Sequence, residues 1–152
     1  MKYSELFESS GGWISGYYHG DSERMEEGIS NRQFLFLTTD KKEARQYGRY
    51  VYRCELLMNN IADLTDRRSK PFRDAVAKFV DDNPSVERFL LGHKMFATNK
   101  FLETEIFKYL FGIGYEVIEF RDESWDEEEI FNIVALGKNV NITERHGMKL
   151  LF

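Results

Sequence analysis

The hydrophobic period of the chain changes twice along its length, and this limits its fold more than any other feature. On both sides of the middle, apolar and polar residues alternate, as in Tyr50 to Leu57 (YVYRCELL) and Tyr115 to Phe120 (YEVIEF). Such alternation is typical of half-buried strands. In the middle, apolar residues recur at helical spacing. The order of strands, helices and strands predicts an α+β fold with a mostly antiparallel sheet, split around a helical insert.

The same patterns, with their end signals, predict the individual elements. Strands are expected over residues 13–19, 34–39, 50–57, 115–120 and 130–136, with short extended pieces at 61–64 and 140–143. A two-turn helix begins after the cap residue Asp40 and stops at Gly48. A helix starting at Pro71 runs to Asn83, which caps a second helix, and a third covers about residues 99–111. The charged stretch 121–128 is expected to be a loop.

Composition narrows the class of protein. At 152 residues with 42% apolar content, the chain is expected to be one folded domain, 1–152. The single cysteine, Cys54, lies in an alternating run and is expected in the core, and no Cys/His cluster indicates a metal. There is no leader and no apolar run of membrane-spanning length, so a cytoplasmic protein without membrane contact is expected.

The charges of the chain give only weak evidence about its binding partners. The net charge of −5 disfavours long nucleic acids without excluding a local patch. Two basic clusters occur, and we interpret them as solvated faces, with phosphate contacts and partner docking as alternatives. They are formed by Lys41, Lys42, Arg45, Arg49 and Arg53, and by Arg67, Arg68, Lys70 and Arg73.

Few residues of the sequence have side chains suited to catalysis or ligand binding, and each of them alone is weak evidence for a function. In Gly16 to Ser22 (GYYHGDS), two aromatic residues lead to His19 and Gly20 at a predicted strand end. A lone histidine there is usually structural, and Phe36 and Tyr47 are more often core residues than ligand platforms. The sequence has no phosphate loop with a lysine, no nucleophile elbow and no histidine pair at metal spacing.

In order, however, these segments resemble the ADP-ribosyltransferases of the His-Tyr-Glu group. The similar phrases are YYHG, FLFLTTD, the helix with ARQYG, VYRCELL with NIADL, and GYEVIEF followed by IFNIVALGKNVNI. They cover both ends of the chain and leave about residues 65–97 unassigned. The nearest likeness is to small phage-type members, including anti-CRISPR proteins of this fold. The resemblance implies an ADP-ribosyltransferase-like split sheet and NAD as co-substrate, with no metal.

The resemblance also implies roles for individual residues. His19 would contact the ribose beside the scissile bond, and Gly20 would let its backbone reach the nicotinamide carboxamide without a side chain in the way. Phe36 takes the place of the usual tyrosine that stacks on the nicotinamide ring, and Tyr47 would close the pocket. Ser22 and Thr38 complete the residues expected around NAD.

The sequence departs from the family at the catalytic glutamate. Aligning IFNIVALGKNV with the family phrase puts Phe131 where that glutamate stands. Glu129 lies two residues earlier, so on an extended chain it would share the sheet face of residue 131. We expect Glu129 to be the acid, with Asp122 in FRDES second and Glu128 third. The alternative is that this acidic stretch is a solvated turn.

The resemblance therefore implies an NAD-dependent mono-ADP-ribosyltransferase that modifies a macromolecule, with a protein as the expected target. If it is phage-encoded, it would act in the host cytoplasm on a host or defence protein. NAD hydrolysis, with water as the acceptor, is a variant of this activity. The alternative class is a non-catalytic module of the same fold that binds NAD or a partner, which the phenylalanine at position 131 would allow.

Overall fold

The computed structural model describes residues 12–25, 28–29, 32–91, 100–123 and 129–145. They divide into two compact units. Unit 1 takes its residues from the segments 1–59 and 133–152, and unit 2 is formed by residues 60–132. The helices of the predicted insert therefore belong to unit 2, together with the strands that flank them. That residues 1–152 form one domain stays a prediction.

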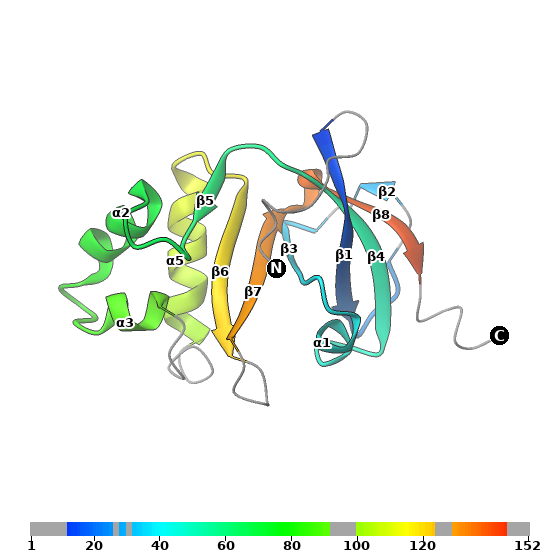
Figure 1. Ribbon diagram of the computed structural model, residues 1–152, viewed down its shortest axis with the longest axis horizontal. Coiled ribbons are helices and arrows are strands. Elements are labelled where there is room, and N and C mark those ends of the chain that lie inside the picture. The colour runs from blue at the N-terminus through cyan, green and yellow to red at the C-terminus, as the bar shows by residue number, and fades with distance from the viewer. Residues whose placement is uncertain (1–11, 26–27, 30–31, 92–99, 124–128, 146–152) are drawn as a thin grey trace. The chain divides into compact units, whose positions relative to one another are not determined.

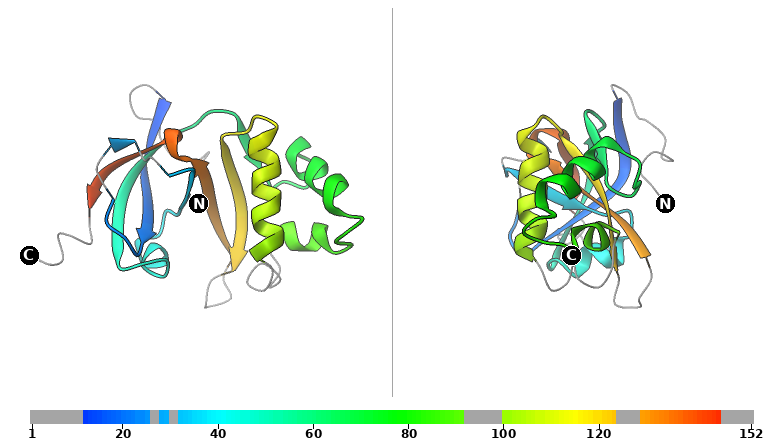
Figure 2. Two further views of the ribbon diagram at one scale, coloured as in Figure 1. Left: turned by 180° about the vertical axis from the view of Figure 1, so that it is seen from behind. Right: turned by 90° about the vertical axis from the view of Figure 1, so that its left-hand side faces the viewer.

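Unit 1 is built on an antiparallel sheet with strand order β1-β4-β8-β2. Its strands are β1 (Trp13–Asp21), β4 (Tyr50–Leu57), β8 (Val140–Arg145) and the short β2 (Gly28–Ile29). β1 and β4 run side by side in opposite views of the molecule (Figures 1 and 2). Between Ile14 and Tyr17 their register shifts, and Gly16 there has a φ of 101°, which a glycine adopts without strain.

The remaining elements of unit 1 flank this sheet. β3 (Phe34–Leu37) pairs antiparallel with Ile133–Leu136, the second half of β7 (Glu129–Leu136). The helix α1 (Lys41–Arg45) begins as predicted, because the Asp40 carboxylate accepts the Lys42 N–H at 2.8 Å. A 3₁₀ turn, η3 (Gly137–Asn139), connects β7 to β8. Cys54 is fully buried, as expected, and burial raises the pKa of its thiol to about 12.

In the described residues of unit 2, three helices combine with short strands. They are β5 (Ile61–Asp63), α2 (Lys70–Phe79), α3 (Val86–Leu90), α5 (Lys100–Gly112) and β6 (Val117–Glu123), followed by the first residues of β7. α5 lies along β6 (Figure 1), and the Phe107 and Phe120 rings meet with centroids 5.1 Å apart. The hydrophobic core of unit 2 forms where the apolar faces of its helices pack against its strands.

The α+β prediction is confirmed, and the ADP-ribosyltransferase-like arrangement stays a prediction. One pairing differs from the expected antiparallel pattern, since β5 runs parallel to β6. The helices α2, α3 and α5 lie between these two strands in the chain. A connection of that length can return the chain to the same end of the sheet, which a parallel pair requires.

Several predicted boundaries are wrong, among them the end of β1, which is Asp21 rather than His19, and the end of α2, which is Phe79 rather than Asn83. β6 continues to Glu123, so Asp122 lies on a strand and not on the expected loop. α2 begins at Lys70, one residue before Pro71, because the Ser69 hydroxyl caps it by accepting the Phe72 N–H at 3.3 Å. The cap position of α3 is Ser85 rather than Asn83. None of the described helices is long and apolar enough to cross a membrane.

Candidate functional site

A cavity of about 340 Å³ opens in unit 1, and we call it the unit 1 cavity. Five of the six residues expected around NAD line it: His19, Gly20, Ser22, Phe36 and Tyr47. Thr38, the sixth, is buried, and its backbone pairs with that of Tyr18. The other lining residues are Asp21, Arg32, Phe34 and Leu35.

His19 is fixed by hydrogen bonds at both ring nitrogens. Its Nδ1 lies 2.7 Å from the Phe36 carbonyl oxygen, and its Nε2 lies 3.0 Å from Asp21 Oδ2. The ring also stacks on that of Tyr52, with centroids 6.5 Å apart. Both hydrogen-bond partners are acceptors, so a ring that carries a proton on each nitrogen donates to both. Any ligand hydroxyl that approaches Nε2 therefore competes with Asp21.

Asp21 connects the polar residues of the cavity lining, since it contacts both His19 and Arg32. It is only 6% exposed, yet both carboxylate oxygens have partners. Oδ1 accepts from the Glu23 N–H at 2.9 Å and from Arg32 Nη2 at 3.2 Å, while Oδ2 lies 3.0 Å from Arg32 Nη1. Burial acts to raise the pKa of Asp21. The Glu23 and His19 hydrogen bonds and the Arg32 charge outweigh it and lower the pKa below its usual value.

The loop behind Asp21 is held from the sheet. The Tyr52 hydroxyl accepts the Met25 N–H at 2.7 Å and donates to the Glu23 carbonyl oxygen at 3.2 Å. Because Tyr52 is fully buried on β4, these two bonds anchor the chain just after β1. The carboxylate of Asp21 and the backbone of Glu23 are therefore positioned before any ligand arrives.

Aromatic side chains supply the apolar wall of the cavity. Phe34 and Phe36 alternate with the buried Leu35 and Leu37 along β3, and their rings meet edge to face at 6.0 Å. Tyr47, just after α1, is 44% exposed. The lining of the unit 1 cavity thus combines aromatic side chains with a fixed charged cluster, a combination suited to a planar ligand with polar substituents.

Packing requires a glycine at position 20, whereas the resemblance implies a contact with nicotinamide as the reason. A Cβ on Gly20 would lie 1.7 Å from the Ala44 carbonyl oxygen of α1. A Cβ on Gly48 would lie 2.3 Å from the Asp21 carbonyl oxygen. These two glycines let the end of β1 and the chain around α1 approach backbone to backbone. The expected contact of Gly20 with a nicotinamide group stays a prediction.

The candidate acids belong to unit 2. Asp122 lies on β6, and Glu129 is the first residue of β7, on the same strand as Phe131. The side chains of these three residues lie outside the part of the chain that the structure describes, as does Glu128 altogether. Among the described residues, no group of three or more histidine, cysteine, aspartate or glutamate side chains is placed to hold a metal ion.

Sequence reasoning missed two charged residues of this site. Asp21 had a usable signal, since residues two apart on a strand share a face and Asp21 is two residues from His19. Arg32 had none, because its approach to Asp21 depends on the path of the chain between β1 and β3. Phe34, which shares its face of β3 with Phe36, could have been found by the same rule of alternation.

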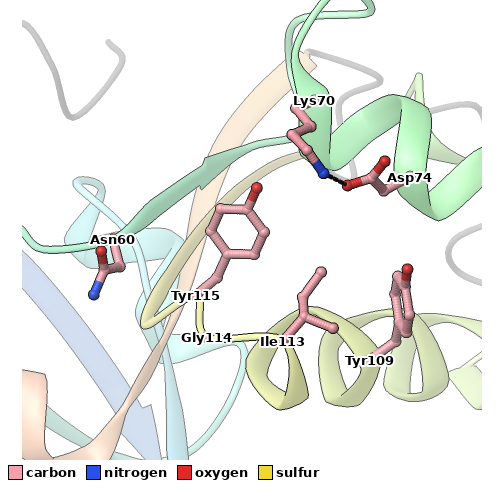
Figure 3. A pocket seen from close by; sticks show the side chains of 7 residues that line it. All are labelled: Asn60, Lys70, Asp74, Tyr109, Ile113, Gly114 and Tyr115. Carbon is pink, nitrogen blue, oxygen red and sulfur yellow. Dashed lines mark hydrogen bonds and ion pairs between the residues drawn. The ribbon is translucent and has the colours of Figure 1, made fainter.

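A second, larger cavity of about 540 Å³ lies within unit 2 (Figure 3), and we call it the unit 2 cavity. Tyr115, Ile113 and Tyr109 line it beneath the pair formed by Lys70 Nζ and Asp74 Oδ2, which are 2.5 Å apart. Ile113 is 51% exposed. The hydrogen bond and charge of Asp74 raise the pKa of Lys70 above its usual value.

Comparisons with known proteins bear on the fold. No family model and no curated protein matches the sequence. A solved structure described as "Crystal structure of an anti-CRISPR protein" is similar, with a TM-score of 0.55 over 93% of this chain and 98% of that chain. The two sequences are 15% identical, so the likeness concerns the fold alone. The chain therefore resembles an anti-CRISPR protein in structure.

Proposed function

We propose that the chain is an NAD-dependent mono-ADP-ribosyltransferase that modifies a macromolecular target. The observation that carries this proposal is the unit 1 cavity. Segments separated in the sequence, namely β1, β3 and the turn after α1, bring His19, Phe36 and Tyr47 to one cavity. These are residues to which the resemblance gives a role in binding NAD, and their grouping around one cavity supports that role.

The properties of the cavity support NAD as the ligand. Its volume of about 340 Å³ lies at the low end of the range of about 300–1,000 Å³ that is usual for small-molecule sites, which suits one end of NAD rather than the whole molecule. Phe36 and Tyr47 offer ring faces for the nicotinamide, and His19 and Ser22 offer polar groups for the ribose. The hydrogen bonds around Asp21 already hold the neighbouring backbone, so the polar groups of His19 and Ser22 need no backbone rearrangement to face the cavity.

The reaction breaks the bond between nicotinamide and the ribose and forms one between that carbon and a nucleophile of the target. Nicotinamide departs with the bonding electrons, and the nucleophile loses its proton to a base or to water. We propose that Phe36 and Tyr47 orient the departing ring and that His19 orients the ribose. A carboxylate near the ribose carbon would stabilise its developing positive charge, and we propose Glu129 for this role, then Asp122.

The structural likeness to an anti-CRISPR protein supports a role for the chain against prokaryotic defence. We propose that the chain acts against a component of a prokaryotic defence system, with a protein as the modified target. Within this proposal, the part of the chain that the transferase resemblance leaves unassigned is about residues 65–97, which include α2 and α3 of unit 2.

A second candidate is a non-catalytic module of the same fold that binds NAD or a partner. Two observations favour it. Phe131 stands where the resemblance expects a glutamate, and both ring nitrogens of His19 already have partners within the protein. In this case NAD would bind in the unit 1 cavity without being consumed.

The test is nicotinamide release from NAD labelled in its adenylate half, with and without a lysate that contains a defence complex. The transferase proposal predicts release with label retained on a macromolecule, whereas hydrolysis gives free ADP-ribose. His19→Ala should abolish release, and the matched control Lys70→Met, in the unit 2 cavity, should keep it. NAD binding without release would favour the second candidate. Release by His19→Ala at the wild-type rate would rule out this site.

A further inference from the structure

The unit 1 cavity contains a charged contact that the proposed reaction does not use. Arg32 is the one lysine or arginine side chain among the described residues that line the cavity. Its side chain is 38% exposed, so the guanidinium reaches from the buried Asp21 toward solvent. A cation held in this way at the edge of an aromatic cavity is a ready contact for an anionic group of a ligand.

Arg32 is oriented by a buried partner and touched by an exposed one. Nη1 and Nη2 face the two oxygens of Asp21 at 3.0 and 3.2 Å, the two-pronged geometry that fixes a guanidinium plane. Nη2 also lies 3.3 Å from Glu23 Oε2, and the Glu23 side chain is 78% exposed. The first contact is therefore rigid, while the second is a solvated ion pair of the weakest kind.

We propose that Arg32 binds the phosphate groups of the ligand of the unit 1 cavity, and that the Glu23 carboxylate holds their place when no ligand is bound. Asp21 positions the guanidinium in both states. The Glu23 backbone stays in place, because its N–H donates to Asp21 and its carbonyl accepts from Tyr52. Only the exposed side chain of Glu23 has to swing away.

This inference rests on the proposed function for the identity of the ligand as NAD, whose diphosphate would meet Arg32. The chemistry itself is more general, since a guanidinium binds the phosphates of any ligand that enters the cavity. Titrations with NAD, ADP and pyrophosphate distinguish a site for NAD from a site that binds the phosphates of any ligand. Nicotinamide riboside carries the same ring and ribose as NAD without the diphosphate, so it is the matched control ligand.

The experiment is calorimetric titration of the full chain at one fixed ionic strength. Glu23→Gln should bind NAD roughly two- to fivefold more tightly, since a solvated pair that competes with the ligand is removed. Arg32→Gln should bind NAD roughly tenfold more weakly or worse. Neither change should alter the affinity for nicotinamide riboside by more than about twofold.

Two controls separate direct competition from other causes. The double variant Glu23→Gln with Arg32→Gln should bind NAD no more tightly than Arg32→Gln alone, whereas a long-range charge effect would persist in it. Arg32→Lys keeps a positive charge beside Asp21 if the glutamine variant fails to fold, and it should still weaken NAD binding by losing the fork.

The outcomes distinguish this inference from the proposed function. If NAD does not bind but ADP or pyrophosphate shows the same pattern across the variants, the transferase proposal fails and the phosphate contact stands. The inference is overturned if Glu23→Gln leaves phosphate-bearing ligands unaffected or weakens them. It is equally overturned if the gain survives in the double variant, or if none of the three phosphate probes binds.

Discussion

The two cavities of this chain hold similar residue types in opposite settings. In unit 1, Asp21 is 6% exposed and both of its oxygens are held by partners, which are His19, Glu23 and Arg32. In unit 2, Lys70 and Asp74 form a pair one helical turn apart, and the Lys70 side chain is 73% exposed. The unit 2 cavity is the larger of the two.

This difference teaches that size is a poor guide to the site. A buried carboxylate must be satisfied by partners, and its geometry is then defined before a ligand binds. An exposed pair along a helix is solvated and contributes little to either stability or binding. The smaller cavity therefore has the better-defined chemistry. Each of the following predictions tests whether the two units differ in this way.

The largest effect is expected from Gly20→Ala. Its Cβ would meet the Ala44 carbonyl oxygen at 1.7 Å, so α1 has to move away from β1. We expect a loss of about 3 kcal/mol or more in the free energy of unfolding, measured by denaturant titration. Gly112→Ala is the matched control in unit 2, where a Cβ meets nothing within 4 Å. It should be neutral or stabilise by up to about 1 kcal/mol. Equal effects of the two changes would contradict the packing account.

Asp21→Asn should cost about 2 kcal/mol of unfolding free energy at pH 7, because it removes the charge that Arg32 and His19 face. The pKa of Asp21 is lowered in the folded state. Its ionisation therefore stabilises the fold above about pH 4. That stabilisation is lost as the pH falls through the folded pKa. Thermal melts from pH 7 to about pH 2 should show the wild type and the variant converging in acid, below the usual pKa of an aspartate. A constant difference across this range would exclude an electrostatic origin.

Phe36→Ala should weaken NAD binding roughly tenfold, since it removes the ring face expected to stack on the nicotinamide. Tyr115→Ala is the matched change in the unit 2 cavity and should leave the affinity for NAD unchanged. Calorimetry on both variants measures the contrast. The reverse order of effects would move the NAD site to unit 2.

The smallest effect is expected from Lys70→Met. The pair with Asp74 is solvated, so its removal should change the melting temperature by less than about 2 °C. Differential scanning calorimetry is sensitive enough to detect a larger shift. A drop comparable to that of Asp21→Asn would mean that the two clusters do not differ in kind.

Local sequence patterns predicted the elements well where they depend on local physics. Tyr50 to Leu57 alternates and forms β4 with these bounds, and Asp40 caps α1. The pattern was wrong where charged residues continue a strand, as in Arg121 to Glu123 of β6. Its charged composition predicts a loop, whereas it forms a strand through pairing with other strands of the sheet, which composition does not show.

The candidate site was predictable only in part for the same reason. His19, Phe36 and Tyr47 were named from an ordered resemblance, and the fold brings them to one cavity. Gly20 was named too, but the steric requirement for a glycine there comes from the Ala44 carbonyl oxygen, which no local signal connects to it. Arg32 was missed because its contact with Asp21 depends on how β1 and β3 are placed by the fold.

The most direct test of this account is a crystal structure of the chain with NAD bound. We predict the nicotinamide ring against Phe36 and Tyr47 in the unit 1 cavity, with the ribose in hydrogen-bonding distance of His19. The side-chain carboxylate nearest the ribose carbon would then decide between Glu129 and Asp122. NAD seated in the unit 2 cavity beside Tyr115, or a unit 1 cavity without NAD at saturating concentration, would contradict the account.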